Sequence, residues 1–374
     1  MKKRTESIYS AVDIGFNSLI SFTTFLYIKD VYGIDILGFF GLLLSVASFV
    51  EVIQMGLYER PAYLGFSVGY KKFKLKIYHL IGLIIFPLLV INQLIISGYI
   101  VSSVLFCIAY VLIQNIRVFD YINHDIKRVS IRSLLIFVMT GSLYGYLILN
   151  NLKVDLNIIF FAIASFRFLF IIFERKKIFA IDFTDENQEI GFLISQLLVL
   201  IRSRLPLWAL LPYGLGLVGI YEAFRTLLEI YLVPSRPIFL VMLKNLKRDG
   251  PKRIFNFGIL FASVTVIMIL ISFYTITSSS FFNINEISTP IAFISIVLIS
   301  IFFWLSEITG MIFQFNSEVT FEAIRRGVSI FIFVLTSLIF YNFLNFNLFL
   351  FLISLMYFSE VAISFYNRKR LQLK

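Results

Sequence analysis

The chain has 374 residues, of which 59% are hydrophobic and only 15% are charged. An ordinary soluble domain has about 45–50% apolar and about 25% charged residues, so this composition excludes a soluble globular protein. The net charge is +11, with 33 Lys and Arg against 22 Asp and Glu, but the basic residues are scattered over short segments between apolar blocks. They do not form the basic surface of a nucleic-acid-binding protein, so nucleic acid is not an expected partner.

Long apolar blocks follow one another along the whole chain. About 20 apolar residues span the hydrocarbon layer as a helix, and these blocks are continuously apolar, unlike the alternating strands of a membrane β-barrel. The sequence therefore predicts an all-α polytopic membrane protein. Its twelve predicted transmembrane helices are 8–28, 36–57, 76–97, 99–119, 130–149, 156–173, 190–211, 214–240, 254–277, 288–314, 327–343 and 347–366.

The basic residues predict which side of the membrane each loop faces. Outer loops hold only Lys29 and Lys153. Because Lys and Arg in short loops mark the cytoplasmic side, both termini are predicted to be cytoplasmic. The predicted inner segments carry 26 Lys and Arg and are 1–7, 58–76, 117–132, 174–189, 243–253, 315–326 and 367–374.

A short pattern recurs in the two halves of the chain. Tyr32–Phe40 reads YGIDILGFF and Tyr213–Tyr221 reads YGLGLVGIY, at an offset of 181 residues. Both segments open the second predicted helix of their half. Because each half holds six helices and starts from the cytoplasm, the repeat is predicted to be parallel, with its axis along the membrane normal. The predicted parts are an N-terminal six-helix bundle (1–178), a cytoplasmic linker (179–189) and a C-terminal six-helix bundle (190–374).

Two segments carry a resemblance to a known family. The run from Leu37-Gly38-Phe39-Phe40-Gly41 through Met55–Arg60, and the run Gly219–Arg225, resemble helices of polysaccharide flippases. The chain thus resembles the O-antigen flippase (Wzx-type) branch of the multidrug/oligosaccharidyl-lipid/polysaccharide (MOP) exporter superfamily. The Gly-x-Tyr-x-x-Ala run that opens the eighth helix of that family is matched loosely by Gly219, Tyr221 and Ala223 or Phe224.

The resemblance implies two six-helix bundles with a central cavity lined mainly by helices 1, 2, 7 and 8. It implies a transporter of the bacterial inner membrane rather than an enzyme, and no cofactor. Its substrate would be an undecaprenyl-pyrophosphate-linked oligosaccharide repeat unit of O-antigen, capsule or exopolysaccharide. The transporter would move this unit from the cytoplasmic to the periplasmic leaflet. Expected partners are this substrate, the membrane lipids, a polysaccharide polymerase and a chain-length regulator.

Five Arg lie inside predicted helices. A charge at bilayer depth costs roughly 3 kcal/mol or more, so it normally faces a protein interior or a wet cavity. Arg202 and Arg204 are about 200° apart around one helix and cannot share a face. At least one of them is predicted to bind substrate in the cavity, and a structural ion pair is the alternative. Arg167 is equally open between the two roles, and Arg236 is predicted to be an interfacial anchor.

The eighth predicted helix carries the clearest polar stripe. Glu222, Arg225 and Glu229 lie at spacings of three and four residues, so they share one face and can pair along the helix. Such a stripe needs an aqueous or protein partner surface, which predicts that it lines the cavity. Since a guanidinium matches phosphate geometry, Arg225 is a candidate contact for a pyrophosphate.

Two acidic residues are candidates for ion coupling. Asp13 and Glu51 lie in the first two predicted helices, where a buried carboxylate can titrate near physiological pH and couple transport to protons or sodium. Neutralisation of the intramembrane Arg is the alternative role. For Glu307 and Glu360 a packing or pairing role is predicted. No metal-binding or catalytic motif is present in the sequence.

Two other functions stay open. An O-antigen polymerase-type membrane enzyme is similarly polytopic, but it usually carries a large periplasmic loop that this sequence does not have. A cation-coupled drug exporter of the same superfamily would favour acidic residues over Arg in its cavity.

Overall fold

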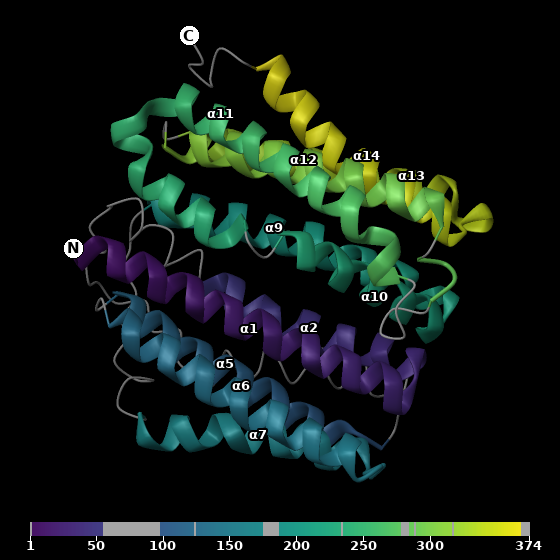
Figure 1. The fold of residues 1–374 in the computed structure, drawn as a ribbon. Helices are drawn as coiled ribbons and strands as arrows, with labels where there is room; N and C mark the ends of the chain where they lie inside the picture. The colour runs from purple at the N-terminus through teal and green to yellow at the C-terminus, as the bar shows by residue number, and fades with distance from the viewer. Residues whose placement is uncertain are drawn as a thin grey trace. The chain divides into compact units, whose positions relative to one another are not determined.

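The computed structural model describes residues 2–54, 98–122, 125–174, 187–232, 235–277, 284–287, 289–315 and 318–367. These ranges form α-helices joined by short connections and contain no β-strand (Figure 1). The all-α prediction is confirmed. The chain divides into two compact units, Met1–Leu197 and Leu198–Lys374. The predicted helix 76–97 and most of the predicted linker 179–189 lie outside the described residues.

The N-terminal unit is a bundle around α5. In it α1 packs against α6 and α2, while α5 packs against α7 and α2. The buried faces that meet are apolar, as in the cluster of Ala109, Ile116, Ile136 and Ala164. The helices of this unit are α1 (Lys2–Tyr32), α2 (Ile34–Gln54), α5 (Ile100–Ile122), α6 (Ile126–Leu149) and α7 (Leu156–Phe173).

The C-terminal unit is a bundle around α12. This helix contacts α10, α11, α13 and α14, and α13 also packs along α14. Trp304 of α12 is buried and donates a hydrogen bond from Nε1 to Thr265 Oγ1 of α11 (3.0 Å). The helices are α9 (Asn187–Leu210), which crosses the boundary between the units, α10 (Leu215–Leu232), α11 (Ser235–Thr277), α12 (Pro290–Phe315), α13 (Val319–Ile339) and α14 (Phe346–Tyr366).

The two units repeat the same junction between their first two helices. Gly33 ends α1 with φ +90° and Gly214 precedes α10 with φ +104°, a backbone region that favours glycine. The tyrosine before each glycine ties the junction to a distant loop. Tyr32 Oη donates to the Val154 carbonyl (2.6 Å), and Tyr213 Oη donates to the Tyr341 carbonyl (2.6 Å). Both acceptors precede the last helix of their unit, so the predicted repeat is confirmed at atomic detail.

The last helix of each unit also begins and packs in the same way. Asp155 caps α7 by accepting from Asn157 N (2.7 Å), and Asn345 caps α14 by accepting from Leu348 N (2.9 Å). A polar side chain at this position satisfies a backbone N–H that has no partner within the helix. Helix α7 then packs on α5, as α14 packs on α12.

Three predicted boundaries in the C-terminal unit are wrong. The helix predicted over 214–240 ends at Leu232, and the basic segment predicted as a loop over 243–253 is helical within α11, with a break at Gly250 (φ 74°). The helix predicted over 327–343 begins at Val319. The two basic segments, 243–253 and 315–326, were misassigned for one reason: clusters of Lys and Arg were assigned to loops, whereas here charged residues continue the helices.

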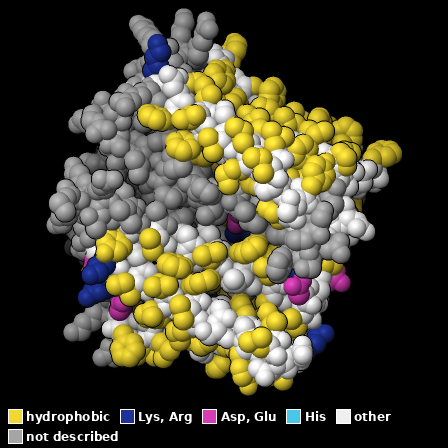
Figure 2. Space-filling model, in the orientation of Figure 1, with side chains coloured by type: hydrophobic (Ala, Val, Ile, Leu, Met, Phe, Trp, Pro, Cys, Tyr) yellow, Lys and Arg dark blue, Asp and Glu magenta, His cyan; other side chains and the backbone are white. Residues whose placement is uncertain are grey.

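Several helices suit a lipid environment. Six of them in the described residues are long and apolar enough to cross a membrane: Ile126–Leu149, Leu156–Phe173, Ile194–Tyr213, Phe255–Thr277, Pro290–Phe313 and Phe346–Tyr366. Large apolar side chains such as Phe161, Ile172 and Ile271 are exposed on them. Figure 2 shows that hydrophobic side chains cover much of the described surface in view, with few charged ones among them. A lipid-facing surface explains this exposure.

Candidate functional site

The predicted stripe on α10 exists as a chain of ion pairs. Arg225 holds Glu222 with two nitrogens, Nε to Oε2 (2.8 Å) and Nη2 to Oε1, and its Nη1 pairs with Glu229 Oε1. The side chain of Glu222 is buried (3% exposed), that of Arg225 nearly so (12%), and that of Glu229 is one-third exposed (34%). The stripe is thus anchored at its buried end and open at Glu229.

Arg202 of α9 lies in a fully buried cluster of the C-terminal unit. Its Nη2 pairs with Glu307 Oε1 of α12 (2.7 Å) and its Nη1 with Glu360 Oε2 of α14 (2.6 Å). The guanidinium also lies over the ring of Tyr357, with its carbon 4.7 Å from the ring centroid. Both terminal nitrogens of Arg202 therefore have carboxylate partners inside the unit, and the predicted pairing role of Glu307 and Glu360 is seen directly.

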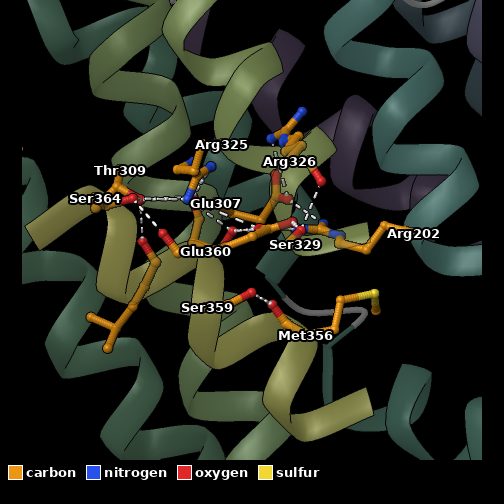
Figure 3. A network of polar contacts seen from close by, with 12 residues as sticks. Arg202, Glu307, Thr309, Arg325, Arg326, Ser329, Met356, Ser359, Glu360 and Ser364 are labelled. Atoms are coloured by element: carbon orange, nitrogen blue, oxygen red, sulfur yellow. Dashed lines mark hydrogen bonds and ion pairs between the residues drawn. The ribbon is translucent and has the colours of Figure 1, made fainter. Parts of the chain in front are cut away.

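The cluster closes on itself through α13 (Figure 3). Glu322 Oε1 lies 2.6 Å from Arg326 Nη2, and its Oε2 lies 2.7 Å from Arg325 Nη2. Arg326 then reaches Glu307 (Nη2–Oε1 3.7 Å), and Arg325 reaches Glu360 (Nη1–Oε2 3.9 Å). We call this alternating cycle of three cations and three anions the arginine–glutamate ring. Its members are Arg202, Glu307, Arg326, Glu322, Arg325 and Glu360.

Hydroxyl groups complete the ring. Ser306 Oγ donates to Glu360 and accepts from Arg202 Nη1 and Arg325 Nη1 (3.2 Å each). Ser329 Oγ donates to the other oxygen of Glu360 (3.0 Å). A buried charge is tolerated where it is paired and hydrogen-bonded. Every charge of the ring is paired, and most of its polar atoms are hydrogen-bonded, the exceptions being Arg202 Nε and two nitrogens of Arg326, Nε and Nη2. The ring joins four helices, α9, α12, α13 and α14.

Arg204 lies two residues beyond Arg202 on α9, outside the ring, and is partly buried. The two arginines thus have different surroundings, as expected from their spacing of about 200° around the helix. Substrate binding by Arg202 or Arg204 stays a prediction.

Asp13 in α1 is the centre of a second polar cluster, in the N-terminal unit. It is fully buried and pairs with Arg117 of α5, both Nε and Nη2 lying 2.9 Å from Oδ2. Its other oxygen accepts from Asn17 Nδ2 (2.8 Å) and from Ser133 Oγ of α6 (2.5 Å). This carboxylate therefore joins three helices, and a coupling role would require Arg117 to release it.

Arg167 in α7 is held differently from the other buried arginines. Its guanidinium carbon lies 5.3 Å from the ring centroid of Phe106 and 5.6 Å from that of Tyr110, and the residue is 7% exposed. No carboxylate pairs with it among the described residues. Aromatic rings, rather than a carboxylate of the described residues, therefore hold Arg167, and its cavity role stays a prediction.

Two predicted residues cannot be evaluated in this way. Glu51 belongs to α2 and Arg236 to α11, but the placement of both side chains lies outside what the structure describes. The coupling role of Glu51 and the interfacial role of Arg236 stay predictions.

Sequence reasoning missed half of the arginine–glutamate ring. Glu322, Arg325 and Arg326 fall in the segment 315–326, which was assigned to a cytoplasmic loop, yet all three are completely buried in α13. Their spacing was an available signal, because a carboxylate three and four residues before two arginines is typical of pairing along a helix. Within the described ranges, no three His, Cys, Asp or Glu side chains come together to hold a metal ion.

The fold is similar to that of solved MATE transporters. A crystal structure of MATE in the bent conformation matches with a TM-score of 0.61 and 12% identity, over 99% of this chain and 95% of that one. A mutant of the Vibrio cholerae MATE transporter VcmN matches with a TM-score of 0.58 and 14% identity, over 99% and 97% of the two chains. VcmN in the bent form matches with a TM-score of 0.56, 12% identity and the same coverage.

No protein-family model and no curated protein matches the sequence. The structural likeness extends over nearly the whole chain and shows that it has the fold of MATE transporters. At this level of identity, a shared fold does not specify the substrate.

Proposed function

We propose that the protein is a flippase that moves lipid-linked oligosaccharides with a pyrophosphate linkage, such as undecaprenyl-pyrophosphate repeat units, from the cytoplasmic to the periplasmic leaflet. The observation that carries the proposal of transport is the fold, which matches MATE transporters over 99% of the chain. The repeated units support alternating access, in which two similar bundles move against each other around a substrate. The choice of substrate rests on the flippase-like motifs and on Arg225.

The α10 stripe is the proposed contact for the pyrophosphate. Arg225 is oriented by the buried Glu222 through two nitrogens, and its third contact, Glu229, is one-third exposed. An incoming phosphate would replace Glu229 at Arg225 Nη1, since both groups present anionic oxygens to the same donor. Arg167, Arg202 and Arg204 remain secondary candidates for substrate contact, and Asp13 and Glu51 remain the proposed coupling carboxylates.

Reconstitution tests the proposal. The purified protein is placed in liposomes containing a fluorescent short-chain polyprenyl-pyrophosphate trisaccharide, and a membrane-impermeant quencher reports how fast the lipid changes leaflet. We expect faster exchange than in protein-free liposomes, and no acceleration for a labelled phosphatidylcholine. If folded protein leaves the rate of the pyrophosphate lipid unchanged with and without an imposed pH or sodium gradient, the flippase proposal is wrong.

Export of an organic cation is a second candidate, favoured by one observation. Two carboxylates flank a single Arg on α10, so the stripe carries a net charge of −1, which suits a cation better than an anion. The same liposomes, loaded with a fluorescent organic cation, distinguish the two functions. Efflux of the dye without exchange of the pyrophosphate lipid would favour the cation exporter.

A further inference from the structure

The loop that joins α13 to α14 is longer than its counterpart in the N-terminal unit. In the counterpart, between α6 and α7, the Val154 carbonyl accepts a tyrosine hydroxyl and the next residue, Asp155, caps the helix. In the C-terminal unit the same two roles belong to Tyr341 and Asn345. Residues 342–344, which read Asn-Phe-Leu, separate them. The two units thus differ in length at a place where their folds otherwise correspond.

The longer loop exposes three aromatic rings. Phe340 is 40% exposed, Tyr341 47% and Phe343 75%. We call these three residues the aromatic loop. The counterpart segment 149–155 contains no aromatic residue, and its Lys153 is exposed. At this position, exposed aromatic rings therefore belong to the C-terminal unit alone.

Backbone and ring contacts hold the aromatic loop in place. Tyr213 Oη donates to the Tyr341 carbonyl, and the two rings pack with their centroids 5.2 Å apart. Phe343 N donates to the Phe340 carbonyl (2.9 Å), within a 3₁₀ turn over Tyr341–Phe343. Because these bonds fix the backbone while the rings stay exposed, the surface of the rings is available to a partner.

The aromatic loop continues an apolar stripe on α13. One face of this helix buries Glu322, Arg325 and Arg326 of the arginine–glutamate ring. The other face exposes large apolar side chains at spacings of three and four residues, as a lipid-facing helix does. These are Ile324, Val328, Phe331, Leu335 and Leu338. The loop follows directly after this stripe, where α13 ends at Ile339 and the chain turns into α14 (Figure 1).

Three environments are available to the aromatic loop, and its chemistry favours one of them. In water the exposed Phe343 ring would stay hydrated, which is unfavourable. In hydrocarbon the non-helical backbone of 340–345 would lack hydrogen-bond partners, because lipid tails supply none. The headgroup layer accepts both groups, since tyrosine is enriched there and Phe side chains of surface-bound segments bury at its inner boundary. The exposed amides of Asn342 and Asn345 also find polar partners in that layer.

We propose that the aromatic loop lies in the headgroup layer of the membrane and anchors the C-terminal unit at that depth, whereas Lys153 of the counterpart loop lies in water. The partner is the lipid interface, which the loop reaches as the continuation of the lipid-facing stripe on α13. Through Tyr213 the anchor also fixes the start of α10 relative to the membrane surface. The proposal does not depend on what is transported, so the anchor and the transport proposal can fail separately.

Spin-label depth measurements test the anchor on the full-length protein in liposomes. The buried Cys107 is replaced by alanine, and a single new cysteine is labelled at Phe343, at Lys153 or at Phe331 in the α13 stripe. Collisions with oxygen report exposure to lipid, and collisions with a water-soluble nickel chelate report exposure to water. We expect the label in Phe343→Cys to lie between that in Phe331→Cys, deep in lipid, and that in Lys153→Cys, in water.

The other outcomes overturn the anchor. A Phe343 label as accessible to the nickel chelate as the Lys153 label would place the loop in water. One as deep as the Phe331 label would place it in hydrocarbon. A label shielded from both reagents would show that protein or sugar, and not lipid, covers the rings.

Substitution of the rings tests whether they hold the loop at this depth. A label at Asn342 is compared with and without the triple change Phe340→Ser, Tyr341→Ser and Phe343→Ser, which retains the backbone carbonyl of residue 341. We expect the label to shift toward water in the triple variant, because serine lacks the apolar surface that favours the interface. A label at Phe331 should keep its depth, and Phe343→Ser alone serves if the triple variant does not fold. An unchanged depth at Asn342 would show that the rings do not anchor the loop.

Discussion

Arg202 and Arg225 lie in consecutive helices of the chain, yet their surroundings differ in whether the guanidinium can exchange its anionic partner. Both terminal nitrogens of Arg202 pair with carboxylates in a ring whose side chains are at most 9% exposed. Arg225 is fixed on one side only, and its outer partner Glu229 is one-third exposed. An arginine of the second kind can exchange one anionic partner for another, whereas breaking the first kind leaves two buried carboxylates unpaired.

Arg202→Ala should therefore destabilise the protein. It removes one partner from Glu307 and from Glu360, and truncating one member of a buried ion pair costs about 3–5 kcal/mol. The measurement is thermal or denaturant unfolding of the purified protein in detergent. Arg128→Ala is the control, because its pair with Asp125 is exposed and should contribute at most about 1 kcal/mol. Equal stabilities for the two variants would show that the ring does not contribute to folding.

Variants of the α10 stripe should change transport more than stability. Under the flippase proposal, Arg225→Ala should lower the exchange rate of the pyrophosphate lipid by at least about tenfold, because it removes the phosphate donor. Glu229→Ala should preserve or raise that rate, since it frees Arg225 Nη1. A loss of exchange in Glu229→Ala together with normal exchange in Arg225→Ala would contradict this assignment and favour a cationic substrate.

At the scale of the elements, the junctions between helices are defined by a few residues. Gly33 and Gly214 have positive φ, and an added Cβ at either would meet no atom within 4 Å. The cost of alanine at these positions is then backbone strain alone, about 1–3 kcal/mol each. Alanine at Gly141, inside α6 and equally open, should instead stabilise by about 0.5–1 kcal/mol. The unfolding midpoints of the three variants test this: the midpoint should fall for Gly33→Ala and Gly214→Ala and rise for Gly141→Ala. A shift of all three in the same direction would contradict the prediction.

Glycine is needed at Gly310 for a different reason, because α12 and α13 approach each other closely there. A Cβ at Gly310 would lie 2.4 Å from Glu322 Oε1 and 3.0 Å from Arg325 Nη2. Alanine there must displace a carboxylate that holds two arginines, so Gly310→Ala should lower the unfolding midpoint even though α12 is a regular helix. Gly327→Ala, with no atom within 4 Å of the added carbon, is the matched control on α13. Equal midpoints for these two variants would mean that the ring tolerates displacement.

The elements were predictable where hydropathy and charge agree and were misplaced where they conflict. The apolar runs at 130–149 and 156–173 predicted α6 and α7 closely. The same reasoning ended a helix at the cluster of Lys and Arg over 243–253 and began another only after Arg326, because it treated basic residues as loop markers. A Lys or Arg can lie inside a buried helix when a carboxylate pairs with it. Which carboxylate does so depends on tertiary contacts, and a single sequence does not contain them.

For the whole molecule, the sequence predicted the architecture better than the site. The Tyr-Gly pattern was enough to propose a repeat, and the structure adds the tyrosine hydroxyl bonds that explain why both residues occur together. The candidate site was predicted only in part. The α10 stripe depends on spacing within one helix and could be read directly, whereas the arginine–glutamate ring joins residues up to 158 positions apart.

The matching junctions at Tyr32-Gly33 and Tyr213-Gly214 bear on the history of the chain. Two halves that share a tyrosine, a left-handed glycine and the same target loop are most simply explained by duplication of one ancestral gene. With an even number of crossings, as the predicted six per half provide, a tandem copy inserts with the same orientation as the original, so such a fusion needs no additional helix between the copies. After duplication the polar interiors diverged. Asp13 pairs with Arg117 between the first and fourth helices of one half, and Arg202 pairs with Glu307 between the first and fourth helices of the other, with the acid and the base exchanged and at a different height along the first helix.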